Sequence, residues 1–69
     1  MFQVLRLLKI GNEDPQEFKV IYKDLENKDQ GYTQTIRTGT EPQLRTLLKD
    51  GGISDPDIDN LFKDVKAHQ

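Results

Sequence analysis

The chain has 69 residues, of which 33% are hydrophobic and 32% charged, with a net charge of −2 and no cysteine. A chain of this length forms one domain with a small core, and without cysteine it has neither disulfides nor thiolate metal ligands. No apolar run approaches the roughly 20 residues of a membrane span. The slight acidity argues against general nucleic-acid binding, which depends on neutralising phosphates.

Three strands are predicted in the first half of the chain. Residues 2–10 are dense in aliphatic side chains, and residues 32–38 are rich in β-branched ones. Residues 17–26 alternate between polar and apolar side chains, which is the two-residue period of a strand. The polar segments 11–16 and 27–31 have the composition of turns. Because the connections are short, the strands are expected to form an antiparallel meander.

The first of two predicted helices begins after Thr40. Thr40 is a good N-cap, and Gln43 stands at the position that completes a capping box. Pro42 falls in the first turn, where its missing N–H costs nothing. An apolar stripe follows at helical spacing (Leu44, Leu47 and Leu48). Gly51-Gly52 ends the helix, because glycine adopts the left-handed conformation readily.

The second predicted helix begins after Ser54, with Pro56 in its first turn. Ile53 and Ile58 have the spacing of a hydrophobic staple. The apolar stripe consists of Ile58, Leu61, Phe62 and Val65.

The sequence therefore predicts an α+β fold of β-β-β-α-α order in a single domain over residues 1–69. A three-stranded antiparallel meander over residues 1–38 is covered on one face by a C-terminal helical hairpin over 40–66, and residues 67–69 fray. Such a two-layer arrangement buries one face of the sheet and the apolar stripe of each helix.

A strand register follows from the apolar pattern. Pairing Ile10 with Phe18, and Tyr22 with Ile36, gathers most large apolar side chains on one face. In this register Arg6 lies opposite Tyr22. The predicted core face holds Phe2, Val4, Leu8, Ile10, Phe18, Val20, Tyr22, Tyr32 and Ile36.

The opposite, open face is the predicted functional surface. A contiguous apolar patch rimmed by polar groups often marks an interface, and the cations at its rim favour an acidic partner. We expect a non-enzymatic, cytoplasmic protein that uses no cofactor or metal and binds a protein partner or a second copy of itself. The predicted contact residues are Leu5, Leu7, Lys19, Ile21, Lys23, Leu25 and Arg37.

Nucleic-acid binding is the alternative prediction, by the same face with Lys9, Lys19, Lys23 and Arg37. The absence of aromatic residues from that face counts against it, because single-stranded nucleic acids stack on aromatic rings. The helical hairpin also resembles a helix-turn-helix, but its second helix opens with aspartates that repel phosphates. A third alternative is the acidic surface between Asp50 and Asp59, which would attract a basic partner.

Other motifs have ordinary structural explanations. Asp55, Asp57 and Asp59 have the opening spacing of a calcium loop, but Asn60 and Lys66 stand where that loop needs glycine and glutamate. His68, the only histidine, lies beside the C-terminus, whereas a general base needs fixed geometry. Three further side chains, the carboxylates Glu13, Asp14 and Glu17, fall in or beside a predicted turn, where a solvated loop explains them.

Overall fold

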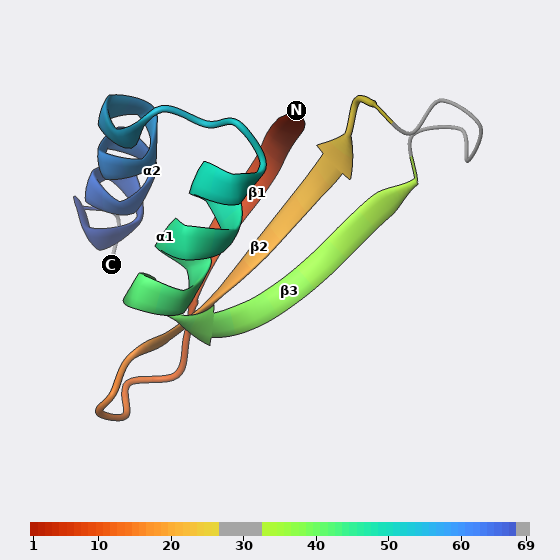
Figure 1. The fold of residues 1–69 in the computed structure, drawn as a ribbon. Coiled ribbons are helices and arrows are strands. Elements are labelled where there is room, and N and C mark those ends of the chain that lie inside the picture. The colour runs from red at the N-terminus through yellow and green to blue at the C-terminus, as the bar shows by residue number, and fades with distance from the viewer. Residues whose placement is uncertain (27–32, 68–69) are drawn as a thin grey trace.

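The protein is a two-layer α+β domain in which two helices cover one face of a three-stranded sheet (Figure 1). The computed structural model describes residues 1–26 and 33–67. The predicted turn at 27–31, Tyr32 and His68 lie outside the described residues. The elements are β1 (Phe2–Ile10), β2 (Glu17–Asp24), β3 (Gln34–Thr40), α1 (Glu41–Asp50) and α2 (Asp55–Ala67). The predicted β-β-β-α-α fold is confirmed.

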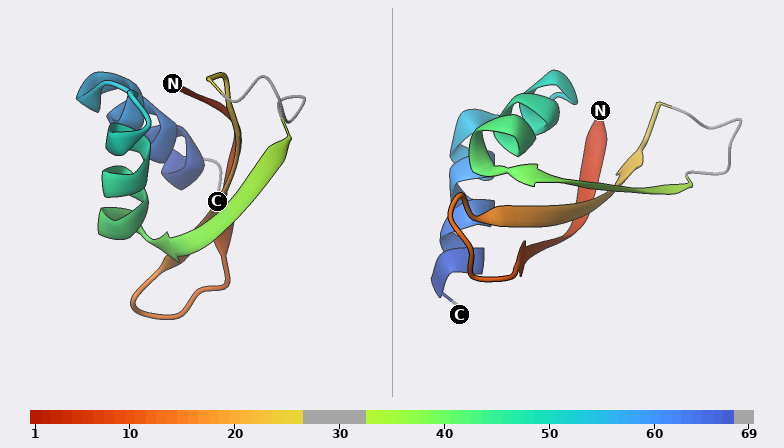
Figure 2. Two further views of the ribbon diagram at one scale, coloured as in Figure 1. Left: turned by 45° about the vertical axis from the view of Figure 1, so that its right-hand side comes forward. Right: turned by 90° about the horizontal axis from the view of Figure 1, so that it is seen from below.

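The sheet is antiparallel, with strand order β1-β2-β3. Helix α1 packs on β2 and on the end of β3, while α2 packs on β1. Figure 2 shows both helices on the same side of the sheet, so that the other side is not covered by any described element. In the described part of the chain, neither helix is long and apolar enough to cross a membrane.

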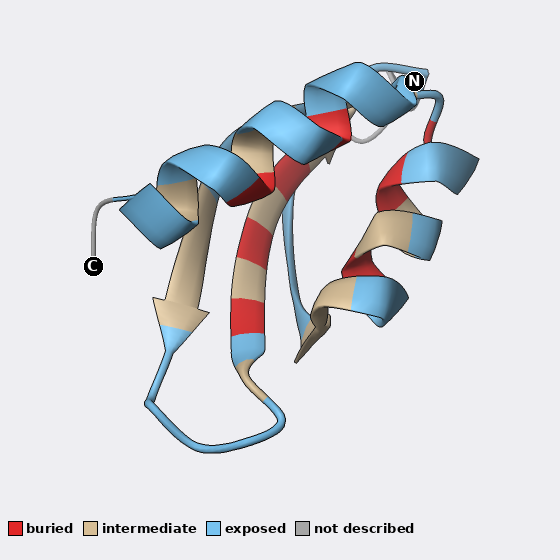
Figure 3. Cartoon of the chain, turned by 90° about the vertical axis from the view of Figure 1, so that its left-hand side faces the viewer, coloured by how far each residue is buried: buried red, intermediate tan, exposed pale blue. Residues whose placement is uncertain are grey.

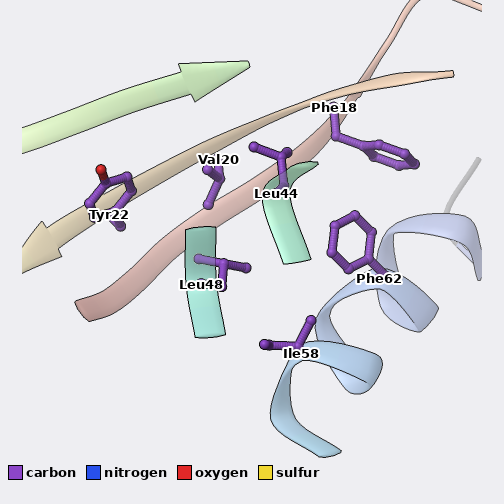
Figure 4. Packing of buried hydrophobic residues seen from close by; sticks show 7 residues of the cluster. All are labelled: Phe18, Val20, Tyr22, Leu44, Leu48, Ile58 and Phe62. Carbon is purple, nitrogen blue, oxygen red and sulfur yellow. The ribbon is translucent and has the colours of Figure 1, made fainter. Parts of the chain in front are cut away.

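The core lies between β2 and the two helices. Alternate residues of β2 are buried, as the bands along this strand in Figure 3 show. The Phe18 ring meets the Phe62 ring edge-on, with 5.1 Å between centroids. Figure 4 shows side chains of both helices converging on β2. The buried set is Phe18, Val20, Tyr22, Leu44, Leu48, Ile58 and Phe62.

The predicted helix boundaries are close to those observed, because local capping interactions set them. The backbone N–H of Thr40 donates to Gln43 Oε1 at 2.9 Å, which is the reciprocal bond of the predicted capping box. Gly51 caps the C-terminus of α1, and Gly52 follows with a φ of 91°. The backbone N–H of Ile58 donates to the Ser54 carbonyl at 3.0 Å, as expected where Ser54 precedes the first turn.

The predicted register of β1 and β2 is wrong by one residue. Ile10 pairs with Glu17 rather than Phe18, and Arg6 lies opposite Ile21 rather than Tyr22. The connection between the strands explains this difference. Gln16 Nε2 donates to the carbonyls of Ile10, Gly11 and Glu17 at 2.8–3.0 Å and so closes the hairpin one residue earlier than expected.

A β-bulge lies between Val4 and Arg6. Because of this bulge, the residues of β1 before it lie on the side of the sheet that the sequence predicts. Val4 pairs with Tyr22 and Arg6 with the adjacent Ile21, which leaves Leu5 as the extra residue. Phe2 and Val4 pack against the core, as predicted. After the bulge, each residue of β1 lies on the side of the sheet opposite to the predicted one. Leu7 packs against the core, while Leu8 and Ile10 lie on the open face.

The predicted register of β2 and β3 is also wrong by one residue, because Tyr22 pairs with Thr35 and Ile36 pairs with Ile21. Gly39 lies opposite Phe18, on the helix side of the sheet. A Cβ there would lie 2.8 Å from Gln43 Oε1, so a larger residue beneath the start of α1 would displace the Gln43 side chain from its capping position. Ile36, three residues earlier, therefore faces the open side and is 58% exposed.

Candidate functional site

The open face of the sheet is built around Ile21, in the middle of β2. Arg6 and Ile36 flank it on the neighbouring strands. Leu8 pairs with Lys19, two residues from Ile21, and therefore lies diagonally next to Ile21. Apolar side chains thus continue from β1 across β2 to β3.

We call this set the apolar strip: Leu5, Leu8, Ile10, Ile21 and Ile36. Leu5, Ile10 and Ile36 are 41%, 38% and 58% exposed, and the other two members are half-buried. Leu5 belongs to the strip because Val4 and Leu7 both pack against the core, which leaves the two residues between them on the open side.

Cations lie beside the apolar strip. Arg6, Lys19 and Lys23 are on the open face with it, and Glu17 is the one acidic side chain among the face's residues in the three described strands. Lys19 and Lys23 are half-buried and flank Ile21 along β2. An aliphatic centre with positive groups around it complements a partner that presents apolar and acidic side chains together.

The structure brings together four of the seven predicted contact residues: Leu5, Lys19, Ile21 and Lys23. Leu25 lies just beyond the end of β2 and is 38% exposed. Leu7 was predicted on the open face, but the bulge turns it toward the core. Arg37 was also predicted there, but it pairs with Val20 and lies on the helix side of β3.

Sequence reasoning missed Leu8, Ile10, Ile36 and Arg6 as residues of the open face. A signal for the first two was present in β1, where the core residues Val4 and Leu7 are three positions apart instead of two. This interruption of the two-residue period marks a bulge. For Ile36, the signal was Gly39 directly before the helix cap, since a glycine there indicates close approach of α1.

The four cations of the predicted nucleic-acid site do not lie on one face of the sheet. Lys19 and Lys23 remain on the open face, whereas Lys9 and Arg37 pair with buried residues of β2 and lie on the other side. Tyr22, the tyrosine of β2, is 5% exposed and stacks on Phe2 with 4.3 Å between ring centroids. Its ring is therefore part of the core.

The outer surface of the helical layer carries a network of ion pairs. Glu41 accepts hydrogen bonds from Lys66 at 2.6 Å and from Arg45 Nε at 2.8 Å, and Arg45 also contacts Asp59. The hydrogen bond from Lys66 lowers the pKa of Glu41, against the opposing effect of burial, and Arg45 lowers it further. The hydrogen bond to Asp59 raises the pKa of Arg45. These groups hold α1 to α2.

Hollows flank the helices, and two of them are lined by side chains of both charges. One lies between β1 and α2 and is lined by Arg6, Lys9 and Asp64 among others. The second lies where the β1–β2 connection meets the start of α1, and it contains the Glu41–Lys66 ion pair. In the second hollow Glu41 and Lys66 therefore already bind each other.

The aspartates with calcium-loop spacing form the first turns of α2, which begins at Asp55. A helical backbone does not wrap around an ion as a calcium loop does. Acidic side chains in the first turn instead stabilise the helix dipole. Among residues 1–26 and 33–67, no group of three or more His, Cys, Asp or Glu side chains is arranged to hold a metal ion.

No protein-family model, curated protein or solved structure matches this chain. The chemistry of the open face is therefore the basis for assigning a function to this protein.

Proposed function

We propose that this protein is a small interaction module whose open sheet face binds an acidic protein segment. The observation that carries the proposal is the apolar strip, which continues across all three strands and has Arg6, Lys19 and Lys23 beside it. Contiguous exposed apolar surface is uncommon on monomeric proteins unless it meets a partner. The cations would select acidic partners and speed their association.

Two features favour a protein partner over nucleic acid. The open face carries no aromatic side chain on its described strands, because Phe18 and Tyr22 are buried beneath the helices. The positive groups of the sheet are also split between its faces, so that no continuous basic groove follows a phosphate backbone.

Selection from a displayed library of random peptides tests the proposal, with Ile21→Glu as the disruptive variant. Ile21 lies at the centre of the strip and is only half-buried, so the domain should still fold. Asn60→Glu is the matched control, because it adds the same charge at an exposed position of α2 on the other side of the molecule. Folding of both variants is checked by circular dichroism.

We expect the enriched peptides to combine aliphatic residues with Asp or Glu. They should bind wild type and Asn60→Glu equally, and lose about tenfold or more in affinity for Ile21→Glu, since a charge placed at the apolar centre of an interface is buried without a partner. Equal binding to all three proteins, or no enrichment, would reject the proposal. Binding of a random single-stranded oligonucleotide with a steep salt dependence would favour the nucleic-acid alternative instead.

A further inference from the structure

The outer edge of β3 is uncovered. It is the last strand of the sheet, and no described strand pairs with that edge. Residues 34–38 are exposed on both sides, since α1 covers only the end of the strand, where Gly39 and Thr40 are half-buried. Figure 2 shows β3 extending away from the helices. An edge of this kind presents backbone N–H and C=O groups to another strand.

The two edges of the sheet differ in how they discourage such pairing. β1 has a bulge and carries Arg6 and Lys9, which are common protective features of edge strands. β3 has no register shift against β2 and contains no proline. Arg37 is its only charged residue, and four of its seven residues are β-branched. The β3 edge is therefore suited to accept another strand.

We infer that a second copy of the chain pairs with this edge, β3 against β3, in an antiparallel arrangement centred on Ile36. A two-fold axis normal to the sheet keeps the open faces of both copies on the same side. The possible centres near the middle of the exposed segment are then Thr35, Ile36 and Arg37. This inference deepens the proposed function, because pairing would double the open face offered to an acidic partner.

The charge and burial of the facing side chains favour Ile36 over Thr35 and Arg37 as the centre of the β3–β3 pairing. With Arg37 at the centre, two guanidinium groups lie directly opposite each other, which is unfavourable. With Thr35 at the centre, Ile36 lies opposite a glutamine, Gln34. With Ile36 at the centre, the two Ile36 side chains meet and Arg37 lies opposite Thr35. The row across the joined sheet is then Ile21, Ile36, Ile36 and Ile21, which buries the side chain that is 58% exposed in the monomer.

The helices do not obstruct this arrangement. In each copy α1 packs near Gly39 and Thr40, at one end of β3. Antiparallel pairing centred on Ile36 joins residues 34–38 of the two copies, which are exposed in each copy, so Gly39 and Thr40 lie outside the paired segment at its opposite ends. A contact made by one short strand is smaller than the roughly 1,200–2,000 Å² of a stable interface, so we expect weak, reversible pairing.

Cysteine cross-linking measures the register, because the natural chain has no cysteine. The variants are Ile36→Cys, Gln34→Cys and Thr38→Cys, all at exposed positions of β3 on the open side. Under mild oxidation Ile36→Cys should give a disulfide-linked dimer about tenfold faster than either other variant alone, since only directly opposed residues meet the short Cβ separation of a disulfide. An equal mixture of Gln34→Cys and Thr38→Cys should form a mixed dimer, because these positions oppose each other.

A charge exchange provides the second measurement. Ile36→Glu and Ile36→Lys should each sediment as monomers at concentrations where wild type associates, and an equal mixture of the two should regain association. Equal cross-linking of all single-cysteine variants, or no dimer in wild type and none in the mixture, would overturn the inference. If the wild-type protein is strictly monomeric and still binds the peptides, self-pairing is rejected and the acidic-partner proposal stands. If it forms the expected dimers but binds no library peptide, the acidic-partner proposal is rejected and self-pairing stands.

Discussion

Gly51 shows how a single residue joins the two layers of this domain. Its carbonyl accepts a hydrogen bond of 2.8 Å from the Phe2 backbone N–H, and a Cβ at this position would overlap the Phe2 ring. The φ of Gly51 is −81°, which any residue adopts. The requirement for glycine is therefore one of space: the first strand packs directly against the end of α1.

Gly51→Ala should accordingly destabilise the domain by about 1–3 kcal/mol, the usual cost of overpacking. The free energy of unfolding, measured by urea denaturation, tests this expectation. In a Phe2→Ala background the same change should cost much less, because the ring it overlaps is gone. An equal cost in both backgrounds would show that Phe2 is not the cause.

The β-bulge in β1 is an element-scale feature with a testable consequence. The pairs on either side of Leu5, Val4 with Tyr22 and Arg6 with Ile21, involve adjacent residues of β2. Deleting Leu5 would therefore make the pairing of β1 with β2 regular. Every other residue of β1 would keep its partner on β2 and its side of the sheet. We expect this deletion to alter the free energy of unfolding by no more than about 1 kcal/mol, because no core contact is lost.

Deletion of Gln3 is the matched control. It leaves the bulge in place but moves Phe2 to the position opposite Lys23, on the open face. Phe2 then loses its stacking on Tyr22, at a cost of about 2 kcal/mol or more. Urea denaturation of both deletion variants makes the comparison. Similar losses in the two would mean that the bulge itself is needed for stability.

The bulge also explains how far the sequence predicted the fold and the open face. Local signals, such as the capping box at Thr40 and the turn at Gly51-Gly52, gave helix boundaries that agree with the structure. Alternation placed Phe18, Val20 and Tyr22 in the core correctly. The facing of Leu7 and Leu8 depends on a bulge and on the closure of a hairpin by Gln16, neither of which alternation alone specifies.

At the scale of the whole molecule, the domain combines a small core with ion pairs between its helices. Seven buried side chains of the described residues form the core, and a domain of this size is typically stable by only about 3–10 kcal/mol. Small interactions on its surface therefore matter. Glu41 is the centre of one such set, since it binds Lys66 of α2 and Arg45 of its own helix.

The pH dependence of unfolding tests this contribution. Because the pKa of Glu41 is lowered in the folded state, chiefly by the hydrogen bond from Lys66, the unfolded state binds the proton more readily. The ion pairs therefore stabilise the fold above the ordinary glutamate pKa of about 4.3, and this stabilisation is lost as the pH falls from there through the folded-state value. Glu41→Gln should lower the free energy of unfolding at pH 7 by about 1 kcal/mol or less.

That difference from wild type should shrink steadily as the pH falls from about 4.3 through the lowered folded-state pKa of Glu41, below which the wild-type carboxylate is neutral as well. Glu13→Gln, in the exposed connection between β1 and β2, is the control and should show no comparable difference at either pH. Thermal or urea unfolding followed by circular dichroism between pH 3 and pH 7 provides the measurement. A Glu41→Gln effect that persists undiminished at low pH would mean that the side chain stabilises the helical layer through packing rather than charge.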